Sequence, residues 1–447
     1  MSRTAGEAGW HESRYNLAAR IPDSDKIAVA NLFRGTCGAY TPIEMFLLDE
    51  METLDENHPM LKRFKERGLI VNFDELAALT ALGRMACAAS DAVELTICPT
   101  MGCNFDCPYC FENHRPGRMS QESQDDVIAL AERMLKVSGA KHLEVTWFGG
   151  EPLLMPDVIE ALSLRLMALA QQYGAEYEAS IVTNGYLLTQ ETADMLGRCK
   201  VAGAQITLDG IGTEHDRTRH LAGGGSTYDR IVENLRILQL PFKVNIRHNV
   251  YEDNRDQIGS LRDCVRALAE ESGNKIGYYA SPVQENIVSE ARDGQLNTLR
   301  SNYLCEVDMR REIGQFHSGR GVYCGAQHLF GVGIDDQGNL FKCWEDVDKP
   351  ERSFGRAGRW DPADPITTAD RPDQLTQYLN TALPMDDLEC RDCKFLPQCA
   401  GGCPTRRVYY QKQCLGGKGA PERYVLGLYE RLLKKHDDKK EQKGEQS

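Results

Sequence analysis

The sequence predicts an α/β fold: a partial barrel of about six strand–helix units, with a winged-helix-like domain before it and a cysteine-rich domain after it. Three observations carry this prediction. Apolar strand-like runs alternate with amphipathic helical segments over residues 91–285. Residues 1–90 contain short strand-like and helical segments of their own, and residues 323–433 hold seven cysteines. Repeated strand–helix units imply a parallel sheet with right-handed crossovers.

Composition narrows the class of protein. At 447 residues the chain is long enough for two or three domains. No apolar run approaches the roughly 18 residues of a membrane span, and the first ten residues do not resemble a secretory signal. Sixteen cysteines without such a signal favour a reducing, cytoplasmic compartment in which thiolates bind metal. The formal charge of −14 argues against nucleic acid as a partner.

The predicted barrel has its functional loops at the carboxyl ends of the strands, as in other folds built from strand–helix units. Strands are expected at 93–97, 143–147, 180–183, 205–208, 243–250 and 275–279. Helices are expected between them at 121–137, 155–172, 189–199, 227–238 and 255–271.

The remaining segments are expected to surround this barrel. Apolar spacing in the first part predicts strands at 26–33 and 69–71 and helices at 43–54, 61–67 and 73–85. Residues 286–322 are expected to form a helical bridge, with a helix at 290–311. A last helix is expected at 422–435, and the charged tail, 434–447, is expected to be disordered.

A cysteine-rich loop follows the first barrel strand. Cys103, Cys107 and Cys110 have the spacing C-x3-C-x2-C. Three thiolates can hold three irons of a [4Fe–4S] cluster, which leaves the fourth iron open to a small molecule. A zinc knuckle or a chance grouping is the alternative, but zinc sites favour two C-x2-C pairs. The loop therefore predicts a reactive cluster.

Polar and glycine residues lie on or directly after the next four strands, where a ligand would lie. Several of them could simply form turns. They are Gly149, Gly150 and Glu151 after the second strand, Asn184 after the third, Thr207 and Asp209 after the fourth, and Arg247 on the polar face of the fifth.

The cysteine loop, with an aromatic residue before its last cysteine, resembles the signature of the radical S-adenosylmethionine (SAM) superfamily. The resemblance implies that Cys103, Cys107 and Cys110 hold the catalytic cluster and that SAM chelates its open iron. It also implies the SAM contacts. Gly149, Gly150 and Glu151 would meet the ammonium, Thr207 and Asp209 the ribose, and Tyr109 would lie near adenine. Asn184 belongs to a similar T-N-G turn, and Arg247 would pair with the carboxylate or form a structural ion pair.

The seven C-terminal cysteines have the pattern C-x13-G-x4-C, a gap, C-x2-C-x5-C-x3-C, a gap, and C. Two zinc sites would also fit C-x2-C alone. The complete pattern resembles the SPASM domain of radical SAM peptide-modifying enzymes, which implies two auxiliary clusters and three [4Fe–4S] clusters in all. The implied ligands are Cys324, Cys343 and Cys403 for the first auxiliary cluster and Cys390, Cys393, Cys399 and Cys414 for the second. The first auxiliary cluster is expected to be open to a substrate thiolate; the alternative is that Cys305 closes it.

The first ninety residues resemble the winged-helix recognition element that captures the leader of a ribosomally made precursor peptide. The leader would add as a strand to an exposed sheet edge, expected at 26–33. The resemblance to radical SAM peptide-modifying enzymes covers residues 91 to about 420, roughly three quarters of the chain. Together with the first ninety residues, the resemblance is to thioether-forming sactipeptide and ranthipeptide synthases, in which a 5′-deoxyadenosyl radical abstracts hydrogen from the peptide. A flavodoxin- or ferredoxin-type protein would donate electrons.

Alternative functions would use some of the same clusters and binding residues. They are carbon–carbon or carbon–oxygen cross-linking, formylglycine formation on sulfatases, and electron transfer without catalysis. Sulfatase-maturating relatives have an Asp directly after the cysteine that corresponds to Cys343, whereas this chain has Trp344 there. Glu345 or Asp346 could take its place only if the loop geometry allows.

Overall fold

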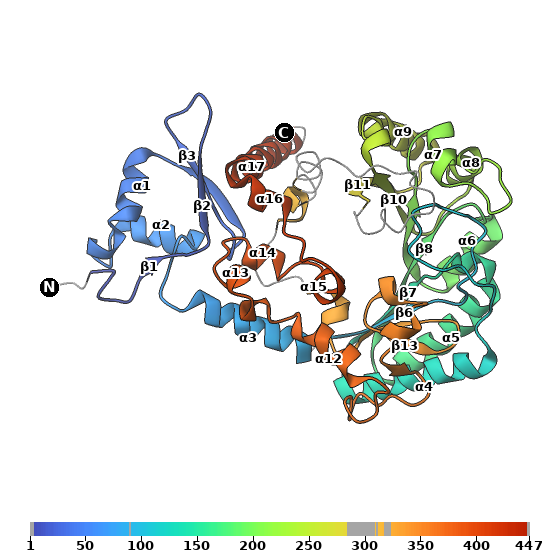
Figure 1. Ribbon diagram of the computed structural model, residues 1–447. Helices are drawn as coiled ribbons and strands as arrows, with labels where there is room; N and C mark the ends of the chain where they lie inside the picture. Colours follow the sequence, from blue (N-terminus) through green and yellow to red (C-terminus); the bar gives the residue numbers. More distant parts are fainter. Residues whose placement is uncertain (1–3, 89–90, 284–308, 310–311, 317–322, 445–447) are drawn as a thin grey trace. The chain divides into compact units, whose positions relative to one another are not determined.

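The computed structural model describes residues 4–88, 91–283, 309, 312–316 and 323–444 (Figure 1). The chain divides into two compact units. Unit 1 comprises Met1–Ala86, Ser301–Tyr323 and Thr381–Ser447, and unit 2 comprises Cys87–Arg300 and Cys324–Asn380. These units divide the 323–433 segment between them. Cys305, the helix expected at 290–311 and most of the expected bridge lie outside the described residues.

Unit 2 is built on a nine-stranded sheet in the order β11-β10-β9-β8-β7-β6-β12-β13-β14. The six predicted barrel strands are present and pair in parallel with their sequence neighbours. They are β6 (Ala92–Ile97), β7 (His142–Trp147), β8 (Glu176–Thr183), β9 (Val201–Thr207), β10 (Lys243–Val250) and β11 (Ile276–Pro282). β12 (Gly331–Ile334) adds in parallel to β6, and β13 (Asn339–Phe341) and β14 (Gly355–Arg356) follow in antiparallel pairing.

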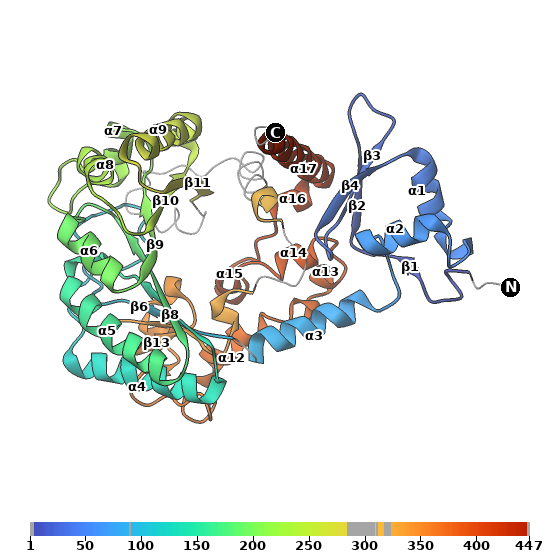
Figure 2. The ribbon, with the colours of Figure 1, turned by 180° about the vertical axis from the view of Figure 1, so that it is seen from behind.

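Helices line one side of this sheet (Figures 1 and 2). They are α4 (Gln121–Ser138), α5 (Pro156–Gln172), α6 (Gln190–Arg198), α8 (Tyr228–Ile237) and α9 (Gln257–Ser272). Alternate strand residues such as Val93, Leu95 and Ile97 are buried and form a continuous apolar core with these helices. The short helix α7 (Thr213–Thr218) was not predicted, because its TEHDRT sequence lacks apolar periodicity.

Shorter helices connect the main elements. In unit 2 they are η2 (Pro152–Leu154), η3 (Glu252–Asn254), η5 (Gly325–Gln327), η6 (Trp344–Asp346), η7 (Pro350–Arg352) and α12 (Pro372–Asn380). In unit 1 they are η1 (Met51–Thr53), η8 (Pro384–Asp386), α13 (Leu388–Arg391), α14 (Leu396–Cys399), α15 (Pro404–Tyr409) and α16 (Gly416–Gly419). No helix among the described residues is long and apolar enough to span a bilayer.

Unit 1 contains a three-stranded antiparallel sheet in the order β2-β3-β4. Its elements are β2 (Asn16–Arg20), β3 (Ile27–Asn31), β4 (Thr36–Tyr40), α1 (Pro42–Asp49), α2 (Pro59–Arg67) and α3 (Glu75–Ala88), with β1 (His11–Glu12) paired to β5 (Ile70–Val71). The expectation of an exposed edge at 26–33 is wrong. β3 is the central strand and pairs on both sides, so β2 and β4 are the edges.

The last helix of the chain packs on this sheet. α17 (Pro421–Gly444) contacts β2, β3 and β4. The two segments share a core in which Tyr15 and Leu32 lie with Phe395, Tyr424 and Leu428. α17 extends well beyond its predicted end at 435, so residues 434–444, expected to be disordered, are helical.

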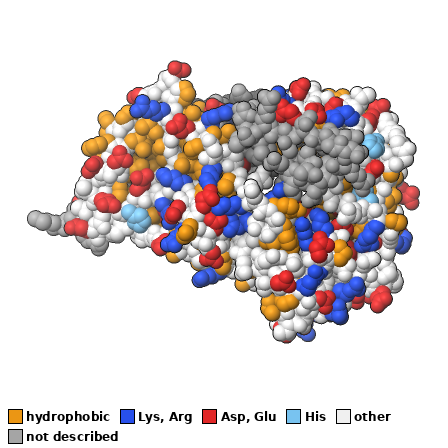
Figure 3. All heavy atoms as spheres, viewed as in Figure 1, with side chains coloured by type: hydrophobic (Ala, Val, Ile, Leu, Met, Phe, Trp, Pro, Cys, Tyr) orange, Lys and Arg blue, Asp and Glu red, His pale blue; other side chains and the backbone are white. Residues whose placement is uncertain are grey.

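The surface of unit 1 carries exposed apolar side chains. Hydrophobic atoms gather on the part of unit 1 that holds α1 and β3 (Figure 3). On α1, Ile43 is 73% exposed and Phe46 62%. α1 follows the edge strand β4 directly along the chain.

Candidate active site

A cavity of about 200 Å³ lies in unit 2 at the carboxyl ends of the parallel strands. It is lined by residues from the loop after β6 and from β7 to β11 or the turns that follow them. Most of the predicted site residues line it: Cys103, Cys107, Tyr109, Cys110, Gly149, Gly150, Asn184, Thr207 and Arg247. Two predicted residues, Glu151 and Asp209, are fully buried and do not line it.

The three loop cysteines face this cavity from half-buried positions. Phe105 anchors the loop by packing edge-on against Tyr186, with ring centroids 5.9 Å apart. Burial raises the pKa of the Cys103 thiol to about 12 and that of Cys107 to about 11. Burial thus favours the protonated thiols, whereas a bound metal would favour the thiolates. Three soft sulfur donors on one loop around one cavity are a donor set that fits an iron–sulfur cluster.

Two glycines let the turn after β7 approach the cysteine loop closely. A Cβ atom on Gly149 would lie 2.3 Å from the carbonyl oxygen of Thr100, and one on Gly150 would lie 2.2 Å from that of Gly102. The φ angle of Gly149 is also +110°, in the region that favours glycine. Any larger residue here would push the turn after β7 away from the backbone of the cysteine loop.

Glu151 ties the turn after β7 to the turn after β8. Its Oε1 accepts hydrogen bonds from the Leu153 amide at 2.9 Å and the Thr183 hydroxyl at 2.7 Å, and its Oε2 accepts from the Asn184 amide at 2.7 Å. Burial raises the pKa of the carboxyl group, although these hydrogen bonds oppose the shift. Both oxygens thus have protein partners. The structure places Glu151 behind the cavity wall.

Glu151→Ala should therefore destabilise the fold. It leaves three buried donors without an acceptor, which should lower the free energy of unfolding by about 3 kcal/mol. Urea unfolding of the purified full-length chain measures this, with Glu122→Ala on the exposed first turn of α4 as the control. Equal unfolding midpoints for the two variants, with weaker SAM binding only in Glu151→Ala, would instead show a direct ligand contact.

The Tyr109 hydroxyl organises a second buried network. It donates to Asp209 Oδ2 at 2.5 Å and accepts from Arg219 Nη1 at 3.0 Å and from Asn249 Nδ2 at 3.2 Å. The Thr218 hydroxyl donates to the same Asp209 oxygen at 2.7 Å. Asp209 therefore orients Tyr109 from behind the wall, and burial raises the pKa of its carboxyl group.

Two arginines reach the cavity from this network and from β10. Arg247 donates from Nε to Asn249 Oδ1 at 2.8 Å and from Nη2 to the Ser281 hydroxyl at 3.4 Å. Arg219 was not predicted, and its Nε has no partner among the described residues. Its charge near Cys107 helps to lower the pKa of that thiol against the effect of burial. The local sequence contains no motif that would predict Arg219 as a site residue. Its position at the cavity depends on α7 and the turn that follows this helix.

One part of the cavity wall, the aromatic wall, is formed by Phe111, Phe148 and Trp344. Phe111 stacks on Phe148 and Phe148 on Trp344, with ring centroids 6.4 Å and 5.4 Å apart. Trp344 is 43% exposed at the cavity, and Glu345 also lines it. Asp346 points away, because it is fully buried and binds Arg352 and Tyr378. Of the two carboxylates considered after Cys343, only Glu345 therefore reaches the cavity.

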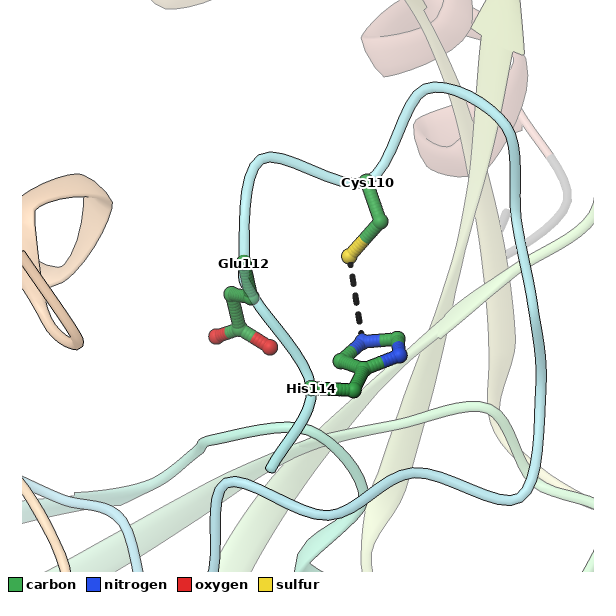
Figure 4. A group of neighbouring side chains, drawn as sticks. All are labelled: Cys110, Glu112 and His114. Atoms are coloured by element: carbon green, nitrogen blue, oxygen red, sulfur yellow. Dashed lines mark hydrogen bonds between the residues drawn. The ribbon is translucent and has the colours of Figure 1, made fainter. Parts of the chain in front are cut away.

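A carboxylate beside the last loop cysteine was also missed. Figure 4 shows Cys110, Glu112 and His114 as neighbours, with Cys110 Sγ 3.3 Å from His114 Nε2. Glu112 Oε1 has no partner among the described residues. Burial raises the pKa of Glu112 to about 8. Glu112 and His114 both line the cavity, which therefore has polar groups on its aromatic side as well.

The C-terminal cysteines fall into two groups. Four of them line one cavity in unit 1: Cys390, Cys393, Cys399 and Cys414. These are the four assigned to the second auxiliary cluster, and four convergent sulfurs fit a [4Fe–4S] cluster. Cys324 and Cys343 belong to unit 2 and Cys403 to unit 1, so the first auxiliary ligand set stays a prediction.

The central part of the chain matches a known family. Residues 97–263 match the family model described as Radical SAM superfamily, so this part of the chain is a radical SAM domain. The AdoMet-dependent heme synthase of Methanosarcina barkeri is 29% identical over 180 residues, which is 38% of this chain and 46% of that protein. The probable GTP 3′,8-cyclase of Archaeoglobus fulgidus is 32% identical over 135 residues, which is 29% of this chain and 40% of that protein. The chain thus spans less than half the length of these relatives.

Two solved structures share the fold over more of the chain. The anSMEcpe structure with bound AdoMet and Cp18Cys peptide has a TM-score of 0.58 and 18% identity, and the alignment covers 77% of this chain and 99% of that one. Streptococcus suis SuiB bound to its precursor peptide SuiA has a TM-score of 0.51 and 16% identity, with 90% and 97% covered. The likeness extends beyond the radical SAM domain.

Proposed function

We propose that this chain is a radical SAM enzyme that modifies a ribosomally synthesised precursor peptide, most simply by forming a thioether cross-link to cysteine. The observation that carries the proposal is the cavity of unit 2. There the three loop cysteines meet polar residues from the ends of successive parallel strands.

The residues that line the cavity would have different roles in the reaction. Cys103, Cys107 and Cys110 would hold the cluster, which with SAM would supply a 5′-deoxyadenosyl radical. Gly149 and Gly150 present backbone close to the cysteine loop, where the ammonium of SAM would bind. Asn184, Thr207, Tyr109 and Arg247 line the remaining polar wall.

The aromatic wall would exclude water from the reacting atoms and hold the peptide. Phe111, Phe148 and Trp344 form a continuous stacked surface, and the exposed part of Trp344 is available to a substrate side chain. A water-excluded pocket protects a carbon radical from side reactions.

A peptide substrate is supported by the solved structures. anSMEcpe and SuiB were both solved with peptides bound, and they resemble this chain over most of its length. In unit 1, the edge strands β2 and β4 are available for strand addition, and the exposed apolar residues of α1 lie next to β4 along the chain. Unit 1 would thus capture the leader segment. A flavodoxin- or ferredoxin-type protein would supply electrons.

Coexpression with a small cysteine-containing peptide encoded beside this gene tests the function. The modified peptide should lose two hydrogen atoms for each cross-link. One cysteine for each cross-link should also no longer react with iodoacetamide, because its sulfur is in a thioether. Mass spectrometry measures both quantities.

The same experiment separates the alternatives. Loss of two hydrogens with all thiols still reactive would indicate a carbon–carbon or carbon–oxygen cross-link, and a new aldehyde would indicate formylglycine. Several relatives are named GTP 3′,8-cyclases, so the purified enzyme should also be incubated with GTP and SAM. Consumption of GTP with an unmodified peptide would contradict the proposal. Absence of 5′-deoxyadenosine under reducing conditions would indicate an electron-transfer protein.

A further inference from the structure

The four-cysteine cavity of unit 1 has cationic side chains directed at its sulfur atoms. Arg407 Nη1 donates to Cys390 Sγ at 3.4 Å, and Lys418 Nζ donates to Cys414 Sγ at 3.6 Å. The two contacts come from different helices, α15 and α16. The loop cysteines of unit 2 have no comparable Lys or Arg contact to sulfur among the described residues.

The cations near these sulfur atoms also form ion pairs with carboxylates. Lys412 also lines the cavity and binds Asp387 and Glu389, each at 2.7 Å. Lys418 binds Glu389 at 2.6 Å, and Arg407 lies 3.7 Å from Asp387. These three cations thus share two carboxylates, while Glu312 accepts from the backbone amides of Gly416 and Gly417. Among the described residues, no carboxylate donates to or accepts from these sulfur atoms, whereas two of the cations donate to them.

Hydrogen bonds and positive charge at ligating thiolates stabilise the reduced form of an iron–sulfur cluster, because reduction adds negative charge. We propose that Arg407 and Lys418 raise the reduction potential of the cluster held by Cys390, Cys393, Cys399 and Cys414, so that it accepts electrons during the reaction. This inference rests on the proposed function, which assigns a cluster to these cysteines.

The proposed reaction needs such an acceptor. When the C–S bond forms, the C–H hydrogen atom passes to the 5′-deoxyadenosyl radical and the thiol proton passes to solvent. One electron is left on the product. A cluster that Cys390, Cys393, Cys399 and Cys414 would hold at a raised potential would be able to take up this electron, whereas the cluster that reduces SAM would need a low potential.

Potentiometric titration followed by electron paramagnetic resonance tests the inference on the reconstituted full-length enzyme. The paramagnetic resonance signal that is lost in Cys399→Ala identifies the cluster of the four-cysteine cavity. In Arg407→Gln and in Lys418→Gln, the ratio of reduced to oxidised cluster at a fixed potential should fall about tenfold, which is a shift of about 59 mV to lower potential for one electron. Arg391→Gln is the control, because it removes an exposed arginine next to Cys390 whose side chain donates to no sulfur among the described residues.

The outcomes separate this inference from the assignment of the cluster. If Cys399→Ala removes no signal, the cluster assignment is wrong and the inference falls with it. If the cluster is present but neither variant shifts its potential more than Arg391→Gln does, the inference alone is overturned. The Lys418 side chain is about one-third exposed, so Lys418→Gln should fold. If Arg407→Gln loses iron, the potential measured in Lys418→Gln alone tests the inference. Arg407→Lys keeps the charge and should restore part of the shift.

Discussion

Replacing Cys103, Cys107 and Cys110 together by alanine will abolish 5′-deoxyadenosine formation from SAM. The reconstituted enzyme should carry about twelve irons in three clusters, and the variant should lose about four of them. The physical reason is that these three sulfurs face the cavity from one loop, and no other described cysteine lines it. Iron and sulfide assays with chromatographic detection of 5′-deoxyadenosine measure both effects.

Cys98→Ala is the matched control for this variant. Cys98 lies on the same segment but is fully buried among Met101, Phe148 and Phe341. Its replacement should cost some stability but no iron, since it does not reach the cavity. Continued SAM cleavage by the triple variant would exclude the loop as the catalytic centre.

The barrel could be predicted from sequence because its signals are local. The strand at 243–250 alternates polar and apolar residues, and the structure has it with the same ends. The cysteine loop and the glycines after β7 were likewise marked by type and spacing. The parallel sheet alone is sufficient to bring the cysteine loop and these glycines to the same edge, because both follow the carboxyl ends of neighbouring strands.

Side-chain direction within the site could not be predicted in this way. Glu151 and Asp209 stand in the expected turns, yet both point behind the cavity wall, where amides and hydroxyls need acceptors. Arg219 and Glu112 reach the cavity through loops whose course depends on distant contacts. The position of a residue in a motif therefore predicts that the residue lies near the ligand site, but not that its side chain contacts the ligand.

The edge strands of unit 1, β2 and β4, were not predicted, for a different reason. β2 (NLAAR) and β4 (TCGAY) contain small and polar residues with weak strand propensity. They are stabilised by pairing with β3 and by packing of α17, which lies about four hundred residues further along the chain. A contact between segments so far apart in the sequence cannot be predicted from the residues of either strand.

Removing residues 1–86 will therefore damage the second auxiliary site and not merely leader recognition. The deletion exposes the faces of Phe395, Tyr424 and Leu428 that pack against Tyr15 and Leu32. Each large apolar side chain loses about 1.5–3 kcal/mol of burial energy. Phe395 and Leu396 also line the four-cysteine cavity. The truncated protein should aggregate and lose about four irons, the content of one cluster.

Iron analysis and size-exclusion chromatography of the truncated and full-length proteins measure these losses. The double variant Ile43→Ser/Phe46→Ser is the control, because both side chains are exposed on α1 and leave the shared core intact. It should remain monodisperse with a full complement of iron. A monodisperse truncated protein with unchanged iron would contradict the prediction, because it would show that the residues around the four cysteines hold their fold without the N-terminal sheet.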